Sequence, residues 1–155
     1  MRIVVLSDAH GYISPVEQAI EQSKPDVVIY CGDGVEKVED ISYLYNDIKF
    51  YFVKGNCDRG DYLVEQEIVI NSKKVFFTHG HLYDVKSGYG KLIAEAKRRA
   101  VDIVMFGHTH IPLNEYHEGL YVLNPGSCAR PQLSKPSYAF VDIVGKNIIT
   151  NIVYL

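Results

Sequence analysis

The sequence predicts an α/β protein in which a central mixed sheet, or two stacked sheets, is flanked by helices. In the first third of the chain, short apolar runs alternate with amphipathic stretches, which is typical of parallel strands joined by helices. Strand pairs separated by short polar turns dominate the last third and predict antiparallel hairpins. The 155 residues suggest one domain over positions 1–155, and the 47% apolar share is ordinary for a globular core.

The first third is predicted to fold as strand, helix, strand, helix, strand. The apolar runs Ile3–Leu6, Val27–Tyr30 and Phe50–Val53 are rich in branched or aromatic residues and are expected to be buried strands. Ser14, followed by proline and with glutamate three residues later, predicts a capped helix start between the first two strands. Apolar residues at helical spacing over 41–48 predict the second helix.

The second half predicts hairpins interrupted by one helix. Ile68–Ile70 and Val75–Phe77 flank a polar turn and are expected to pair. An amphipathic helix is expected over Ser87–Arg99, followed by a strand over Ile103–Phe106. The remaining predicted strand pairs are Asn114–His117 with Tyr121–Leu123, and Tyr138–Val144 with Ile148–Val153.

Composition and charge exclude several classes of function. Sixteen Lys and Arg against nineteen Asp and Glu give a net charge of -3, which argues against a broad nucleic-acid interface. No apolar stretch approaches the roughly 20 residues of a membrane span, and the first apolar run is too short for a signal peptide. Cys31, Cys57 and Cys128 form no C-x-x-C pair, so a cytoplasmic location is expected. The twelve tyrosines would fit exposed patches and a homo-oligomer.

Polar side chains follow five predicted strands at the point where each strand ends. Because the carboxyl ends of parallel strands share one edge, and ligands bind outside that edge, these turns are expected to converge. The five motifs are Asp8-x-His10, Gly32-Asp33, Gly55-Asn56-Cys57-Asp58, His79-Gly80-His81 and Gly107-His108-Thr109-His110.

Five of the six histidines lie in these motifs, together with carboxylates. Imidazole and carboxylate are the ligands of Mn, Fe, Zn, Ni or Co. His108 and His110 are expected to project from one face of an extended segment. Taken singly, the motif at Asp8 has a structural explanation as a helix-capping pair, and that at Asp33 as an ordinary turn. Five such turns in one chain favour a metal site.

In order and spacing, these motifs resemble the metallophosphoesterase signature of the calcineurin-like superfamily. The resemblance covers about residues 3 to 127, and the motifs at 55–58, 79–81 and 124–127 resemble its compact YfcE-like phosphodiesterase branch. It implies a four-layer α/β/β/α sandwich of mixed sheets flanked by helices. It also implies two divalent metal ions per chain, with Mn expected first and Ni, Zn, Fe or Co as alternatives. The implied substrate is a small phosphate ester.

The resemblance also assigns the ligands. The first metal would be held by Asp8, His10, Asp33 and His110, and the second by Asp33, Asn56, His79 and His108. A carboxylate has two oxygens and can therefore serve two cations, which suits Asp33 as the bridge. Two ions about 3.5–4 Å apart would lower the pKa of a shared water, and the resulting hydroxide would attack phosphorus and break a P–O bond.

Cys57 departs from the wider superfamily, which usually has a histidine here that assists the leaving group. A thiol is a poor hydrogen-bond donor, so protonation of the leaving group by Cys57 is in doubt. His81 is a candidate substitute, and a purely structural role beside His79 is its alternative. Asn56, Cys57 and His81 are thus the candidate catalytic residues. Arg130 is expected to form a surface ion pair rather than to reach the substrate phosphate.

Two rival interpretations lead away from this activity. The first is a non-catalytic metal-binding scaffold of the same fold, like the retromer subunit, which has lost typical metal ligands; all seven are present here. The second is a different hydrolase. The residues after His79 do not fit the metallo-β-lactamase signature, and the chain has no G-x-S-x-G, G-x-G-x-x-G or P-loop motif.

Overall fold

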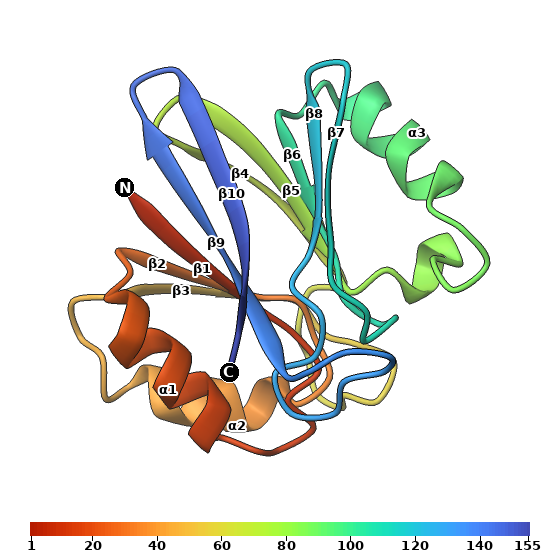
Figure 1. The fold of residues 1–155 in the computed structure, drawn as a ribbon. Coiled ribbons are helices and arrows are strands. Elements are labelled where there is room, and N and C mark those ends of the chain that lie inside the picture. Colours follow the sequence, from red (N-terminus) through yellow and green to blue (C-terminus); the bar gives the residue numbers. More distant parts are fainter.

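Two five-stranded sheets pack face to face in the computed structural model, which describes residues 1–155 (Figure 1). The first sheet contains, in spatial order, β10 (Asn147–Tyr154), β9 (Ser137–Val144), β1 (Arg2–Leu6), β2 (Val27–Tyr30) and β3 (Lys49–Phe52). The second contains β4 (Glu65–Ile70), β5 (Lys73–Thr78), β6 (Ile103–Met105), β8 (Leu120–Asn124) and β7 (Leu113–His117).

Helices cover the outer face of each sheet. The helices α1 (Ser14–Ser23) and α2 (Val35–Ser42) pack on the first sheet, and α3 (Gly90–Arg99) packs on the second (Figure 1). A short 3-10 turn, η1 (His81–Tyr83), precedes α3. The four layers confirm the predicted α/β/β/α sandwich. None of the three helices is both long enough and apolar enough to cross a bilayer.

Both sheets are mixed, and their parallel strands lead to the same end of the sandwich. In the first sheet β1, β2 and β3 are parallel; in the second β5, β6 and β8 are parallel. The strands β4, β7, β9 and β10 add antiparallel pairs. The loops that follow the parallel strands come together toward the lower end of the molecule in Figure 1.

Alternation along the strands fills the three apolar layers between sheets and helices. On β1, Ile3 and Val5 face the second sheet, whereas Val4 and Leu6 face α1 and α2. Successive side chains of a strand point to opposite faces, so a strand covered on both sides must be apolar throughout. This is why the run at positions 3–6 has no polar interruption.

The second helix lies earlier in the chain than its apolar pattern predicted. It begins after Gly34, whose φ of 113° is one that glycine adopts without strain. Tyr45 and Ile48 suggested helix because they pack on the same core, but they do so from the loop after the helix, and Leu44 is exposed. The buried residues of α2 are Val35, Val38 and Ile41.

Two further details of the predicted helices are wrong. Ser14 is the first helical residue, Ile13 occupies the N-cap position, and no side chain caps the helix; only the proline in the first turn is as predicted. The third helix begins at Gly90 rather than Ser87, because η1 and an irregular segment occupy the chain before it.

Candidate metal centre

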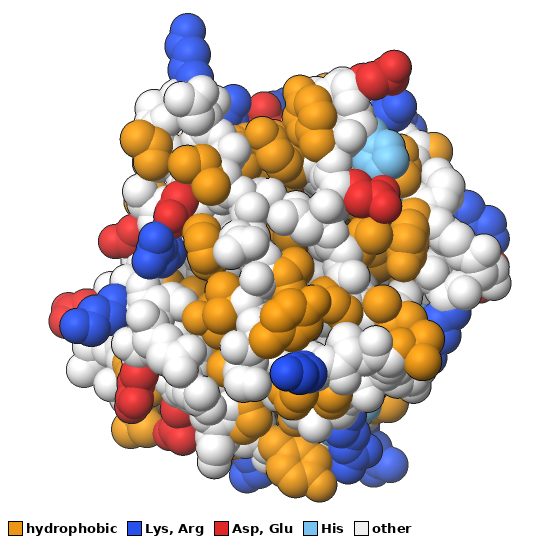
Figure 2. Space-filling model, in the orientation of Figure 1, with side chains coloured by type: hydrophobic (Ala, Val, Ile, Leu, Met, Phe, Trp, Pro, Cys, Tyr) orange, Lys and Arg blue, Asp and Glu red, His pale blue; other side chains and the backbone are white.

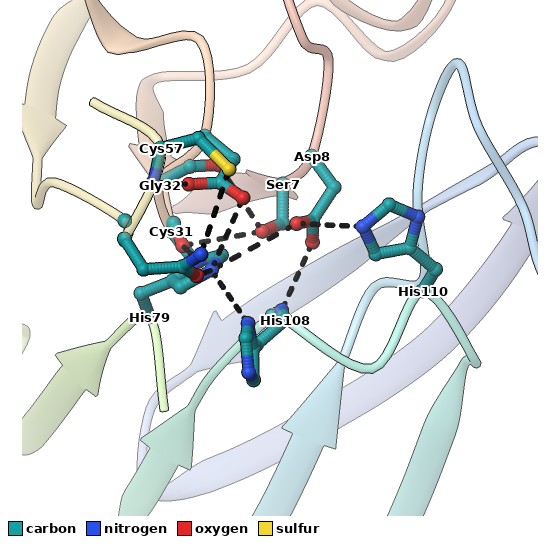
Figure 3. Close-up of polar contacts among 12 residues, drawn as sticks. Ser7, Asp8, Cys31, Gly32, Cys57, His79, His108 and His110 are labelled. Carbon is teal, nitrogen blue, oxygen red and sulfur yellow. Dashed lines mark hydrogen bonds and ion pairs between the residues drawn. The ribbon is translucent and has the colours of Figure 1, made fainter. Parts of the chain in front are cut away.

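The five predicted motifs meet where the two sheets adjoin. Asp8, His10, Asp33 and Asn56 follow strands of the first sheet, and His79, His108 and His110 follow strands of the second. The sequence placed all of them at one sheet edge, whereas the structure divides them between two sheets whose ends lie side by side. Figure 3 shows the side chains of His79 and His110 pointing toward Asp8, and the ring of His108 beside that of His79.

The backbone of these loops is turned rather than extended. Asp8 and Asp33 have φ values of 57° and 60°, and His108 and His110 have 67° and 60°. Side chains other than glycine rarely adopt this region, at a cost of about 1–3 kcal/mol each, and such strain clusters at functional sites. The expected extended arrangement of His108 and His110 is therefore wrong. The turned backbone sends one imidazole toward His79 and the other toward Asp8.

Asp8, His10 and His110 form the first cluster. The Nε2 atom of His110 lies 3.2 Å from Asp8 Oδ1 and 3.3 Å from His10 Nε2. His110 Nδ1 lies 2.5 Å from the carbonyl oxygen of Arg130. A carbonyl can only accept, so Nδ1 carries the proton of the neutral ring and Nε2 presents a lone pair. Asp8 Oδ1 is buried and has no hydrogen-bond partner.

A lone pair facing a carboxylate oxygen at this distance calls for a positive charge between them. The pKa of His110 is raised, chiefly by its interaction with Asp8, which shows that the position attracts positive charge. A divalent cation would satisfy both atoms and the orphaned Asp8 Oδ1 at once.

His79 is the centre of the second cluster. Its Nδ1 donates to the Cys31 carbonyl at 2.7 Å, which leaves a lone pair on Nε2. That Nε2 lies 3.2 Å from Asn56 Oδ1 and 3.1 Å from His108 Nδ1. Burial lowers the pKa of His79, but the nearby carboxylate of Asp33 outweighs it and the net shift is upward. Burial, with the charge of His79, lowers the pKa of His108 to about 4, so its ring is neutral at pH 7 and can serve as a ligand.

Asp33 lies between the two clusters. Its Oδ2 is 3.8 Å from His10 Nε2 and 3.5 Å from His79 Nε2, whereas its Oδ1 accepts the backbone N–H of Cys57 at 2.9 Å. Sequence reasoning expected one oxygen for each cation, but a single oxygen faces both clusters. Burial raises the pKa of Asp33, yet hydrogen bonds from His79 and Cys57 reverse this and hold it well below its usual range. The carboxylate is therefore ionised and fits a shared ligand.

The donor set fits divalent metal ions of the first transition row. Imidazole nitrogens and carboxylate oxygens are the mixture these ions prefer. The groups of residues whose ligand atoms all lie within 4.8 Å of one another are Asp8/His10/His110, His10/Asp33/Cys57 and Asp8/Asp33/His79. Asp8 and Asp33 each belong to two of these groups, which makes the two clusters one continuous site.

Comparison with known proteins identifies the family. The model of the calcineurin-like phosphoesterase superfamily domain matches residues 1–146. The chain belongs to this superfamily. It is 30% identical over 148 residues to the probable metallophosphoesterase YsnB of Bacillus subtilis, covering 92% of this chain and 85% of that protein. It is 26% identical over 173 residues to the phosphodiesterase YfcE of Escherichia coli, covering 92% and 88%.

Solved structures agree with the superfamily assignment. A predicted phosphoesterase from Streptococcus pneumoniae superposes with a TM-score of 0.84 at 29% identity, covering 99% of this chain and 88% of that chain. Vps29 from Entamoeba histolytica, solved with Zn²⁺, superposes with a TM-score of 0.77 at 24% identity, covering 99% and 98%. The second similarity shows a shared fold alone.

In this phosphoesterase domain a cavity of about 420 Å³ opens over the two clusters. Of the candidate catalytic residues, Asn56 and Cys57 line it. His81 does not; its ring lies 5.4 Å from that of His79, and its buried Nδ1 has no hydrogen-bond partner. The other lining residues are His10, Asp33, Lys86, His108, His110, Arg130, Pro131 and Gln132.

The expected surface ion pair of Arg130 is wrong. Its guanidinium has no carboxylate partner and lies 5.4 Å from the centre of the Tyr12 ring, and the residue lines the cavity. Lys86 and Gln132 also line the cavity, although nothing in the sequence pattern singled them out. They lie several residues beyond the strand-end motifs of their loops, so only the folded chain brings them to the site.

Tyr30 is a supporting residue that the sequence pattern did not indicate. Its buried hydroxyl donates to the Asp33 carbonyl at 2.7 Å and accepts the backbone N–H of Ala9 at 3.0 Å. One hydroxyl thus ties together the loop of Asp8 and the loop of Asp33. As part of an apolar strand, Tyr30 showed only the pattern of a core residue.

Asp58 and Ser127 belong to the sequence motifs, and their side chains hold the ligand loops in place by hydrogen bonds. Ser127 Oγ donates to the Asp8 carbonyl at 2.8 Å. Gly55 must be glycine, since any side chain there would collide with the Asp33 carboxylate. The backbone N–H groups that donate to the Asp58 carboxylate are those of Asp33, Gly34, Val35 and Gly55.

Proposed function

We propose that this chain is a metal-dependent phosphodiesterase that breaks a P–O bond of a small phosphate ester at a site holding two divalent cations. Membership of the phosphoesterase superfamily supports a hydrolase. The observation that carries the proposal is the arrangement around Asp33 Oδ2. That oxygen faces His10 on one side and His79 on the other. The Nδ1 protons of His79 and His110 are used by backbone carbonyls, so the Nε2 atom of each ring presents a lone pair to the site.

These contacts support the ligand assignment that the family resemblance implies. The first cation would be held by Asp8, His10, Asp33 and His110, and the second by Asp33, Asn56, His79 and His108. When bound, such a pair supplies Lewis-acid activation of water and of the phosphate oxygens. The carbonyls of Cys31 and Arg130 hold His79 and His110 in the tautomer that presents Nε2 to a cation.

Two residues beside the candidate ligands, Cys57 and His81, are the candidates for delivering a proton to the leaving group. Burial and then the Asp33 carboxylate raise the pKa of the Cys57 thiol, so it is protonated at neutral pH. A thiol nevertheless donates hydrogen bonds weakly. We assign the proton donor to His81 rather than Cys57, because its ring lies 5.4 Å from that of His79 and 6.1 Å from that of His108, next to the cavity that His108 lines.

An interaction scaffold is the second candidate, and its support is the superposition on Vps29 over 99% of the chain. A scaffold needs no complete ligand set and no open cavity above it. Here the seven candidate ligand residues lie together beneath a cavity, which favours catalysis.

The decisive experiment combines metal analysis with hydrolysis of bis(p-nitrophenyl) phosphate. Chelated and dialysed protein should be inactive, and Mn²⁺ should restore turnover to a preparation holding about two ions per chain, with Zn²⁺, Ni²⁺, Fe²⁺ and Co²⁺ compared in parallel. Asp8→Asn should abolish turnover, and His117→Ala, which changes a histidine outside the site, should not. Full activity of metal-free protein would refute the proposal. A protein loaded with two ions and inert toward phosphate mono- and diesters would support the scaffold.

A further inference from the structure

Two cationic side chains line the cavity above the metal centre without a partner of their own. Lys86 follows η1 and Arg130 follows β8, and both border the same cavity as His10, His108 and His110. Neither side chain donates a hydrogen bond or forms an ion pair within the chain, in contrast to the paired arginines of α3. Unpaired cations beside a cavity indicate an anion as its occupant.

Arg130 is built into the site rather than loosely attached to it. Its guanidinium lies over the ring of Tyr12, a cation–π contact that restricts its orientation. Its backbone N–H donates to Ser127 Oγ at 2.7 Å, and its carbonyl accepts the Nδ1 proton of His110. The residue that fixes the tautomer of a ligand therefore also brings a positive charge to the cavity.

Positive side chains gather at the lower right of the drawn face of the molecule (Figure 2). Figure 2 shows Lys and Arg side chains at the lower right of the molecule, with no Asp or Glu side chain beside them on this face. The planar guanidinium of Arg130 has parallel N–H donors that can bind two oxygens of one phosphate group. The ammonium of Lys86 adds a positive charge on a flexible side chain.

Charge balance indicates which phosphate esters suit this cavity. Two bound divalent cations against the carboxylates of Asp8 and Asp33 leave two positive charges, which the attacking hydroxide and one phosphodiester anion would neutralise. Lys86 and Arg130 add two more positive charges to the same cavity. A simple diester leaves them unbalanced, whereas a diester bearing a second phosphate group brings about two negative charges in addition.

We propose that Lys86 and Arg130 form an anion subsite, and that the preferred substrates are phosphodiesters that carry a second phosphate group on the same molecule. This inference rests on the proposed function, because it concerns the selection of substrates at the same metal centre.

The test compares two chromogenic substrates with the same scissile bond. One is thymidine 5′-(p-nitrophenyl phosphate), and the other is its 3′-phosphorylated form. The metal-loaded protein should hydrolyse the second with kcat/KM about tenfold higher or more, because charge-assisted hydrogen bonds from Lys86 and Arg130 would hold the second phosphate. Arg130→Gln and Lys86→Gln should each lower this ratio severalfold, and the double variant should bring it close to one. Lys146→Gln, at the β9–β10 turn, is the matched control and should leave the ratio unchanged.

The binding of the two reaction products separates the subsite from the activity. Calorimetry with thymidine 3′,5′-bisphosphate and thymidine 5′-phosphate should show the same preference in the wild-type protein and its loss in the double variant. If neither ester is hydrolysed but this preference is present, the subsite holds and the proposed function fails. Equal kcat/KM for the two esters in the wild type, or variants that slow both esters equally, would overturn the subsite.

Discussion

Asp33 Oδ2 and His79 Nε2 lie 3.5 Å apart although their residues follow strands of different sheets. Asp33 follows β2 and His79 follows β5, and these strands share no hydrogen bonds. Their contact exists because the apolar faces of the two sheets pack against each other, which places the ends of β2 and β5 close together. The candidate metal centre is thus a product of the sheet-to-sheet packing, and its geometry depends on residues from both halves of the chain.

Loss of the Asp33 charge should lower the number of bound metal ions. Asp33→Asn removes the negative charge from the oxygen that faces both clusters, so we expect metal content to fall to one ion per chain or below. Activity should fall in parallel, by at least about 10²-fold. Elemental analysis after dialysis measures the stoichiometry, with the exposed Asp61→Asn as the matched control. Two tightly held ions in Asp33→Asn would contradict the bridging assignment.

Removal of the Tyr30 hydroxyl should weaken metal binding without unfolding the protein. Tyr30→Phe keeps the ring in the core but leaves the Ala9 N–H without its acceptor and loosens the two ligand loops. A lost buried hydrogen bond costs about 1–3 kcal/mol, so the Kd for Mn²⁺ should rise about tenfold or more. Titration calorimetry reads this effect, and circular dichroism confirms the fold. Tyr43→Phe, which changes an exposed tyrosine, should alter neither the Kd nor the circular dichroism spectrum. An unaltered Kd in Tyr30→Phe would show that the Tyr30 hydroxyl does not position the ligand loops.

The two candidate proton donors should respond differently to the leaving group. A nitrophenolate leaves as the anion, whereas an alkoxide needs a proton, and general-acid help is typically worth about 10²–10⁴-fold. We expect His81→Ala to slow alkyl esters far more than nitrophenyl esters, and Cys57→Ala to change both only slightly. The measurement is kcat/KM against the pKa of the leaving group for the wild type and both variants. A selective loss on alkyl esters in Cys57→Ala would identify the thiol as the acid instead.

The ion pair between Arg2 and Asp142 should contribute a pH-dependent part of the stability. Two hydrogen bonds, of 2.8 and 2.7 Å, join the guanidinium to the carboxylate, and they lower the pKa of Asp142 below its ordinary value. The stabilisation is therefore complete above about pH 4, where the unfolded carboxyl is ionised, and it is lost as the pH falls through the folded pKa.

Asp142→Asn should accordingly lower the free energy of unfolding by about 0.2–1 kcal/mol at pH 7, since the pair is partly exposed to solvent. The difference from the wild type should persist at pH 5 and shrink toward pH 3. Urea unfolding of chelated protein at each pH measures it without a contribution from metal binding. Asp40→Asn, which breaks an exposed pair with Lys37, should have no measurable effect. If the loss of stability in Asp142→Asn grew as the pH fell, the predicted direction of the pH dependence would be wrong.

The sequence by itself determined the order of strands and helices and the identity of the candidate ligands. Buried strands such as Ile3–Leu6 must be apolar on both faces, so their composition marks them without reference to the rest of the chain. Ligand motifs such as Asp8-x-His10 sit directly after these strands, and the chemistry of imidazole and carboxylate is a local property. The position of α2 was harder to predict, because Tyr45 and Ile48 bury their side chains from a loop.

Only the tertiary structure decided how the ligands face one another and what surrounds them. The division of the site between two sheets, the single Asp33 oxygen between His10 and His79, and the turned backbone of His108 all depend on contacts between segments far apart in the chain. The same holds for the Tyr30 hydroxyl and for the cations at the cavity, because a residue without a local motif acquires its role from its neighbours in space. Local patterns encode which groups are present, whereas long-range packing sets the distances that give those groups their chemistry.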